Sequence, residues 1–338
     1  MLRLGCLVGL LTLSEHPFAA LTPDRVLTAV ESLGFDTDAR FFALNSYENR
    51  VYQIGLLDGT NLIAKFYRPN RWDARQIREE HAFTQELFDL EIPVVPPMKL
   101  ARSETHVEVD GFVLALFPQL IGRTPELDDL GSLFTMGRFV ARMHAIGAKT
   151  CFDYRQHLTL DAAQESSYHL LENDFLPSDL NVAYETLVLD LFDRMSEQLA
   201  SAGAWRPLRI HGDCHLGNVL WHEGTPHFVD FDDTVMGPAI QDLWMLLSGD
   251  RDHRQAQLLE LAEGYNEFYD FRVSELRFIE ILRTMRLINY SAWLARRWND
   301  PAFPLNFPWF NTQRYWADHI LELREQIVAL DEPTLQLI

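Results

Sequence analysis

Apolar residues recur with two different periods along the first part of the chain. Residues 21–34 have helical spacing, with Thr22 placed to cap the helix and Gly34 placed to end it. Residues 40–67 alternate between apolar and polar positions instead, and an Asp58-Gly59 pair separates two of the β-rich runs. The pattern therefore predicts a helix followed by three strands, the last two joined by a tight turn.

The same region continues with a second helix and a second hairpin. Residues 72–90 place their apolar side chains on or near one helical face. The proline-rich stretch 92–98 reads as an extended approach to a strand, and residues 106–117 form a hairpin around an Asp-Gly pair. Residues 21–118 are thus predicted to form a small α+β lobe.

The pattern changes to mostly helical after residue 118. Residues 118–126 have the composition of a connector, and one β-rich stretch, 207–233, interrupts the helical part. Helical periodicity is sustained in four long runs, at residues 128–147, 179–201, 253–270 and 274–297. We therefore predict an α+β chain with two lobes, a β-rich N-lobe at 21–118 and a helical C-lobe at 119–338, with residues 1–20 as an extension outside the fold.

Composition narrows the classes of function. The chain has 338 residues, of which 47% are hydrophobic, and this length is sufficient to bury two cores. A formal net charge of -20 argues against nucleic acid and anionic membranes as partners, because both require a cationic surface. The cysteines have no paired spacing, which argues against a disulfide framework or a zinc site and suits a reducing cytoplasm; they are Cys6, Cys151 and Cys214.

The strongest chemical signal is the string HGDCHLGNVLW at 211–221, followed by HFVDFDD at 227–233. Phosphoryl transfer needs a carboxylate that orients the acceptor hydroxyl and oxygen ligands that hold Mg²⁺ against the phosphates. Asp213, Asn218 and Asp230 have the spacing of such a set in kinases. We predict Asp213 as the catalytic base, Asn218 as a metal ligand, and Asp230 as a metal ligand that also takes part in catalysis.

The other polar residues of this segment receive more ordinary interpretations. His211 stands where kinases carry a structural histidine, and Cys214 and His215 are expected to pack and to shape the loop. Asp232 and Asp233 are expected to be solvated or salt-bridged acids at the end of a strand.

The two strings together resemble the signature of the aminoglycoside phosphotransferase and choline kinase superfamily. Further segments are similar to the bacterial stress-response serine/threonine protein kinases within it: ALNSYENRVYQI at 43–54, AKFYRP at 64–69, GPAIQDLWMLL at 237–247 and YSAWLARRWNDPAFPLNFPWF at 290–310. The similarity runs from about residue 20 to the C-terminus. It implies a bilobal kinase-like fold with ATP bound in the cleft between the lobes and Mg²⁺ as the cofactor.

The resemblance also places the residues that would contact ATP. It puts Lys65 on the third strand, where an ammonium neutralises the nucleotide phosphates, and Ser46 at an ATP contact in a phosphate-covering loop that lacks glycine. The partner of Lys65 would be Glu79 or Glu80 on the next helix, and the spacing to Leu87 matches the family better with Glu80.

Several residues outside these motifs are expected to serve the fold. Asp242 is expected to hold the metal-binding segment against the C-lobe, and Arg296 and Arg297 to lie on a solvated helix face. Core and interdomain packing is the expected role of four tryptophans, Trp293, Trp298, Trp309 and Trp316.

We therefore expect an ATP- and Mg²⁺-dependent serine/threonine protein kinase that acts as a monomer in the cytoplasm on an unidentified protein substrate. A kinase for an amino alcohol, a sugar or an aminoglycoside remains the alternative. A pseudokinase is a third possibility, against which the complete set of Lys65, Asp213, Asn218 and Asp230 argues.

The first residues, MLRLGCLVGLLTL, have the pattern of a short signal peptide but are too short to span a bilayer. Phe18 disfavours a cleavage site, and ATP chemistry requires the cytosol. We expect instead that translation begins near Ser14 and that deleting residues 1–13 leaves an active enzyme.

Overall fold

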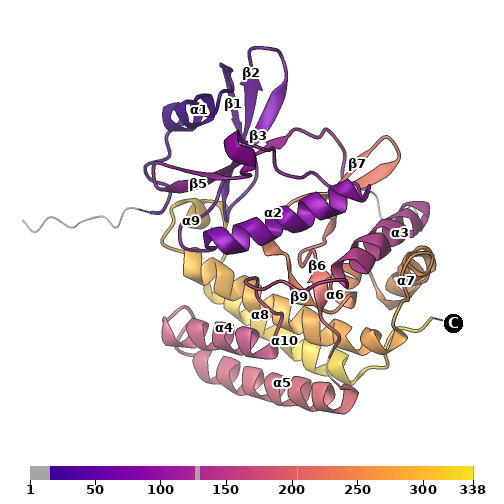
Figure 1. Cartoon of the computed structure of the whole chain (residues 1–338). Helices are drawn as coiled ribbons and strands as arrows, with labels where there is room; N and C mark the ends of the chain where they lie inside the picture. The colour runs from indigo at the N-terminus through magenta and orange to yellow at the C-terminus, as the bar shows by residue number, and fades with distance from the viewer. Residues whose placement is uncertain (1–15, 126–129, 204, 338) are drawn as a thin grey trace, which may run out of the picture.

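A computed structural model describes residues 16–125, 130–203 and 205–337 of the chain. It confirms the bilobal kinase-like fold: the small β-rich lobe lies above the large helical lobe, and helix α2 crosses the junction between them (Figure 1). The segment 1–13 that resembles a signal peptide lies outside the described residues. Within them, every helix is too short or too polar to cross a bilayer.

The N-lobe is an antiparallel sheet with the strand order β1-β2-β3-β5-β4. Its elements, in chain order, are α1 (Pro23–Glu31), β1 (Thr37–Ala43), β2 (Arg50–Leu56), β3 (Asn61–Phe66), α2 (Ala74–Asp89), a 3-10 turn (Ala101–Ser103), β4 (Val107–Val109) and β5 (Phe112–Pro118). Thr22 caps α1 as predicted, since its hydroxyl accepts from the Arg25 amide. The proline-rich approach to β4 forms no strand, because three of its residues are prolines without an N–H; only Val94 makes an isolated bridge, to Phe228.

The alternation along the strands gives the sheet two different faces. One face packs against α1 through residues such as Val26, Ile54 and Phe66, which are all buried. The opposite face carries Ile63 and Lys65 on β3 toward the cleft and α2, because successive side chains of a strand point to opposite sides. The side chain at position 65 is therefore directed toward the cleft by the strand period.

The C-lobe is mostly helical, as predicted. Its elements are α3 (Leu130–Gly147), α4 (Leu160–Glu172), α5 (Asn181–Ala202), β6 (Leu208–Ile210), η2 (Leu216–Asn218), β7 (Val219–His222), β8 (Thr225–Phe228), η3 (Phe231–Asp233), β9 (Val235–Gly237), α6 (Ile240–Trp244), α7 (Arg251–Asn266), η4 (Val273–Phe278), α8 (Ile279–Arg297), α9 (Ala302–Asn306) and α10 (Gln313–Asp331). Strands β6 and β9 form one two-stranded sheet, and β7 and β8 form another.

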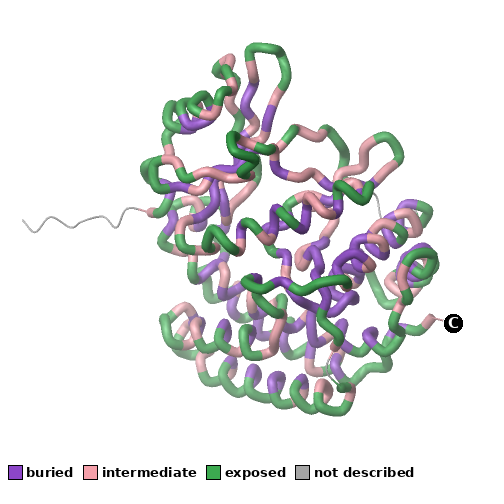
Figure 2. Tube along the Cα trace, in the orientation of Figure 1, coloured by how far each residue is buried: buried purple, intermediate pink, exposed green. Residues whose placement is uncertain are grey.

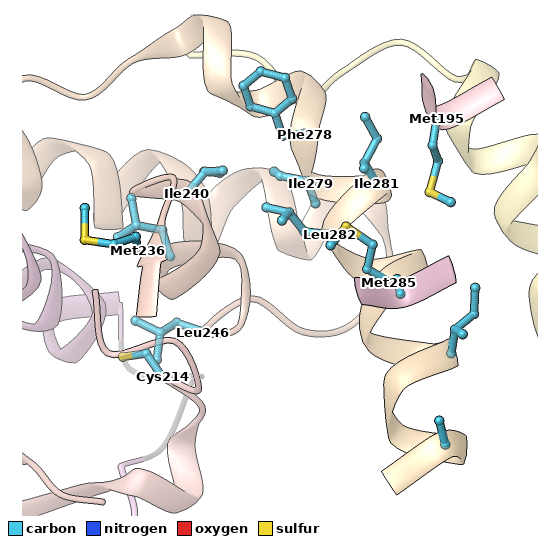
Figure 3. Packing of buried hydrophobic residues seen from close by; sticks show 14 of the residues in the cluster. Met195, Cys214, Met236, Ile240, Leu246, Phe278, Ile279, Ile281, Leu282 and Met285 are labelled. Atoms are coloured by element: carbon cyan, nitrogen blue, oxygen red, sulfur yellow. The ribbon is translucent and has the colours of Figure 1, made fainter. Parts of the chain in front are cut away.

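The helices of the C-lobe enclose one large apolar core, which is continuous through the lobe (Figure 2). Helices α3 and α7 pack closely because Gly137 and Gly264 lie at their contact: a Cβ at either would overlap a carbonyl oxygen of the other helix. The N-terminal half of α8 inserts Ile281, Leu282 and Met285 into this core, the same cluster that contains Cys214 and Ile240 (Figure 3). The loop that carries Asp213 is thus attached to a packed apolar base.

Candidate active site

Lys65 lies at the centre of a buried group of charges beneath the sheet. Its Nζ is 3.4 Å from Glu80 Oε1, 3.2 Å from Asp230 Oδ1 and 3.0 Å from Asp232 Oδ1. Only 5% of the residue is exposed. Burial alone would lower the pKa of Lys65, but the carboxylates of Asp232 and Glu80 raise it well above its usual value. Lys65 therefore carries a fixed positive charge where it faces the cleft.

Helix α2 presents its two adjacent glutamates to different partners. Glu80 is buried and contacts Lys65, the Tyr67 hydroxyl at 2.9 Å and the Arg155 guanidinium at 2.6 Å. Glu79 instead accepts the backbone N–H groups of residues 153 to 155. This geometry agrees with the assignment of Glu80, rather than Glu79, as the partner of Lys65.

The loop that follows β6 holds Asp213 at the edge of the cleft. Asp242 accepts the N–H groups of His211 and Gly212, both at 2.8 Å, and His144 lies 3.0 Å from the same carboxylate. Gly212 has φ of 85°, and a Cβ there would overlap the carbonyl of Asp233, so glycine is needed at this close approach. Asp242 therefore attaches the loop that carries Asp213 and Asn218 to helix α3 of the C-lobe.

His211 connects this loop to the segment that carries Asp230. Its Nε2 lies 2.9 Å from the Val229 carbonyl, one residue before Asp230, and its Nδ1 accepts the Asp213 N–H at 3.3 Å. His211 therefore links the two loops by hydrogen bonds, which agrees with the structural role expected for it. Cys214 is fully buried, and burial raises the pKa of its thiol, which agrees with a packing role.

The Asp213 carboxylate lies between the guanidinium group of Arg286 and the imidazole ring of His215. Arg286 Nη1, from helix α8, is 2.6 Å from Oδ1, and His215 Nε2 is 3.4 Å from Oδ2. Burial raises the pKa of Asp213, but hydrogen bonds and charge from His215 and Arg286 outweigh it and hold the pKa well below its usual range. Asp213 is therefore ionised and able to accept a hydrogen bond from a hydroxyl group.

Asn218 and Asp230 supply the oxygen atoms that a hard cation prefers. Asn218 Nδ2 donates to the Asp213 carbonyl at 3.0 Å, which leaves its Oδ1 free to bind a cation. Asp230 has φ of 60°, a left-handed conformation that is uncommon outside glycine and typical of functional sites, and 51% of its side chain is exposed. The described residues hold no group of three or more His, Cys, Asp and Glu side chains that could bind a metal ion. Asn218 and Asp230 would therefore hold Mg²⁺ together with phosphate oxygens rather than in a closed protein cage.

Two adjoining cavities share Ser46, Asn218 and Asp230. The first, about 320 Å³, lies under the sheet and is lined by Lys65 and by apolar side chains such as Val51 and Ile63. The second, about 710 Å³, contains Asp213 and is bordered by helix α8. The first has the apolar walls and the lysine suited to a nucleotide, and the second places the carboxylate of Asp213 on the acceptor side.

Asp232 was expected to be a solvated or salt-bridged acid, and the structure shows that it is salt-bridged. Asp232 is buried and contacts Lys65 and Arg71; burial raises its pKa, but Arg71 and Lys65 lower it well below its usual range. Arg297 is not on a solvated face as expected, because its Nη2 lies 2.9 Å from Glu48 in the N-lobe. Arg155, Arg286 and Arg71 come from segments without a motif, so only the fold could bring them to the site.

The comparisons with known proteins agree on one family of kinases. The phosphotransferase enzyme family matches residues 40–279. "Stress response kinase A" of Escherichia coli O157:H7 is 43% identical over 96% of this chain and 98% of its own length. "Serine/threonine protein kinase RdoA" of Salmonella typhimurium is 42% identical over 95% of this chain and 97% of its own.

Solved structures with the same fold include two kinases of small molecules. An amicoumacin kinase in complex with AMP-PNP and Ca²⁺ has a TM-score of 0.73 at 22% identity, covering 90% of this chain and 93% of its own. A microcompartment-associated aminopropanol kinase has a TM-score of 0.70 at 18% identity, covering 93% of this chain and 100% of its own. At these identities the likeness concerns the fold alone.

Proposed function

This chain belongs to the phosphotransferase enzyme family, and we propose that within it the chain is an ATP- and Mg²⁺-dependent protein kinase that phosphorylates serine or threonine hydroxyls. The observation that carries the kinase chemistry is the meeting of Lys65, Asn218 and Asp230 at one cavity, with Asp213 in the cavity that adjoins it. The phosphate donor and the base thereby lie on opposite sides of the position at which a phosphoryl group would be transferred.

Each residue receives a role from its contacts. Lys65, fixed by Glu80, would neutralise the ATP phosphates, and Ser46 would contact them from the covering loop. Asn218 Oδ1 and the Asp230 carboxylate would hold Mg²⁺, which supplies charge neutralisation at the transferred phosphoryl group. Asp213 would orient the acceptor hydroxyl and take its proton.

The charges of the acceptor cavity support a peptide hydroxyl over a polycationic acceptor. Each acidic side chain in its described lining already has a cationic partner within the protein: Glu48 with Arg297, Asp213 with Arg286, Asp230 with Lys65, and Asp232 and Asp233 with Arg71. An aminoglycoside would have to compete with these arginines and with Lys65 for every carboxylate. The names of the relatives, stress response kinase A and serine/threonine protein kinase RdoA, support the same acceptor and a role in a stress response, which we place in the cytoplasm.

A small-molecule kinase is the second candidate. The observation in its favour is the size of the acceptor cavity, about 710 Å³, which is within the range of pockets that enclose small ligands. An uncharged sugar, or an amino alcohol with its single positive charge, would compete with fewer of these ion pairs than an aminoglycoside.

Acceptor choice decides between the two candidates. The purified chain would be incubated with labelled ATP and Mg²⁺, alone, with myelin basic protein, and with a panel of aminoglycosides, choline, homoserine and sugars. We expect phosphoserine or phosphothreonine on the kinase and on the protein acceptor, and no label with the Asp213→Asn variant as the control. Saturable turnover of one small molecule without protein labelling would replace this proposal with the second candidate.

A further inference from the structure

The phosphate-covering loop, residues 45–49, contains no glycine, yet its backbone is held in a defined way. Three of its carbonyl oxygens are bound by two arginines, one at the start of β2 and one just after β3: Arg50 Nη1 lies 3.0 Å from the Tyr47 carbonyl and 3.2 Å from that of Asn49, and Arg68 Nε lies 2.9 Å from the Glu48 carbonyl. Across the described part of the chain, no hydrogen bond uses an N–H of residues 45–49 as its donor. The carbonyl groups of residues 47 to 49 are therefore occupied, and the described contacts leave the amide groups of the loop available.

Both arginines are held in turn by one carboxylate from the far end of the chain. Arg68 Nη2 lies 2.8 Å from Asp300 Oδ2, and Arg50 Nη2 lies 3.1 Å from the same atom. Arg68 is 4% exposed and Asp300 is 3% exposed, so these charge-assisted hydrogen bonds are shielded from water. Asp300 lies two residues before the start of helix α9, which lies next to the N-lobe (Figure 1).

The side chain of Glu48 attaches the tip of the loop to helix α8. Its carboxylate accepts the Trp293 indole N–H at 2.5 Å and contacts Arg297 at 2.9 Å and Arg68 at 3.1 Å. Burial raises the pKa of Glu48, but Arg71, Arg297 and Arg68 together bring it below its usual value. The loop is thus attached both at its backbone and at its tip.

We infer that Glu48, Arg68 and Asp300 are positioning residues that hold the glycine-free loop with its amide groups toward the nucleotide phosphates. In most phosphate loops glycine allows the backbone to approach the ligand; here arginines bound to the carbonyl groups orient the peptide planes instead. The inference rests on the proposed function, since it assigns the ligand of the loop as the β- and γ-phosphates of ATP.

A purely structural role makes a different prediction about nucleotides. If these residues only join the lobes, their loss changes the affinity for adenosine and for ATP in the same proportion. If they orient the loop amides, the loss falls on ATP and ADP, because adenosine has no phosphate for the loop to bind.

The test measures the affinities of the full chain for adenosine, AMP, ADP and ATP with Mg²⁺ by titration calorimetry, without any acceptor. We expect the near-isosteric variants Asp300→Asn and Glu48→Gln to bind ATP and ADP about tenfold more weakly, because each variant weakens one or two charge-assisted hydrogen bonds that hold the loop. Adenosine should bind within about twofold of wild type. Asp331→Asn, which removes an exposed partner of Arg194, is the matched control and should bind all four ligands as wild type does.

Unchanged ATP affinity in both variants, or an equal loss for adenosine, would overturn the inference while leaving the kinase proposal intact. A wild-type chain that binds no ATP would overturn the proposed function and the inference with it. If thermal unfolding shows that Asp300→Asn does not fold, Glu48→Gln decides alone, because Glu48 lines the acceptor cavity.

Discussion

Asp213 combines two properties that a base in phosphoryl transfer requires. It is ionised, because Arg286 and His215 hold its pKa well below the usual range, and it lines the acceptor cavity but not the cavity that contains Lys65. Its contribution should therefore appear in the transfer step rather than in nucleotide binding.

We predict that Asp213→Asn lowers the rate of phosphotransfer by about 10²–10⁴, the usual cost of losing a positioned base. ATP affinity should stay within about threefold of wild type, since an amide of the same shape preserves the loop. Turnover with labelled ATP and a parallel nucleotide titration measure the two effects. Wild-type turnover in this variant would remove Asp213 from the catalytic assignment.

Asn218 and Asp230 should instead affect the dependence on Mg²⁺. We predict that Asn218→Ala and Asp230→Ala raise the Mg²⁺ concentration needed for nucleotide binding by about tenfold or more, because each removes one oxygen ligand from an ion that requires near-ideal geometry. A fluorescent ATP analogue titrated with Mg²⁺ provides the measurement. A wild-type Mg²⁺ profile in both variants would show that other residues bind the metal.

At the scale of single residues, the sequence was informative where the chemistry is local. Asp213, Asn218 and Asp230 lie within one short motif-bearing segment, and their meeting at one cavity could be predicted from their spacing. Arg286 and Arg155 could not be predicted, because α8 and the segment before α4 carry no motif and reach the site only through the packing of the lobe.

At the scale of elements, helix α2 directs two adjacent glutamates to different partners. Successive helical residues point about 100° apart, so Glu80 faces Lys65 while Glu79 faces the backbone of residues 153 to 155. The amino-acid sequence alone allowed either glutamate, since both lie on the same helix.

We predict that Glu80→Gln and Glu79→Gln, a matched pair of variants, separate activity from stability. Glu80→Gln should lower kcat/KM for ATP by about tenfold or more, because Lys65 and Arg155 lose a shared buried carboxylate. Glu79→Gln should retain kcat/KM within about threefold and show its effect in the midpoint of thermal unfolding. The reverse ranking in steady-state kinetics would assign the role to Glu79.

The elements themselves were predicted unevenly. The Asp58-Gly59 turn, helix α1 and helix α2 were foreseen because caps, turn residues and periodicity coincide there. Helices α4 and α10 were not predicted, and the run at 274–297 proved to be a 3-10 helix followed by α8. Contacts with other helices, such as Leu170 and Trp316 in the core, stabilise α4 and α10.

At the scale of the whole molecule, buried histidines make stability depend on pH. His81 is 2% exposed and lies 2.9 Å from the Tyr67 hydroxyl and 2.7 Å from the Thr105 hydroxyl. Burial, followed by the charge of Lys65, lowers its pKa to about 2. Below a pH of about 6.5 the unfolded chain binds a proton at this histidine that the folded chain does not, so stability falls as the pH falls.

We predict that His81 contributes a loss of about 2 kcal/mol in the free energy of unfolding between pH 6.5 and pH 5, at about 1.4 kcal/mol per pH unit. His81→Gln should flatten the slope of stability against pH by about one proton, whatever its effect on stability at pH 7. Urea unfolding at several pH values measures the slope. Parallel curves for the variant and the wild type would contradict the assignment.

The ion pair between Arg68 and Asp300 joins residues that are 232 positions apart in the chain. On a ribosome, residue 68 therefore emerges on the order of 10–50 s before its counter-ion, at about 5–20 residues per second. The sheet can form in that interval, but the loop above the nucleotide cannot take its final shape. Because Asp300 is inferred to position this loop, a nascent chain that stops before residue 300 should bind ATP more weakly than the complete protein.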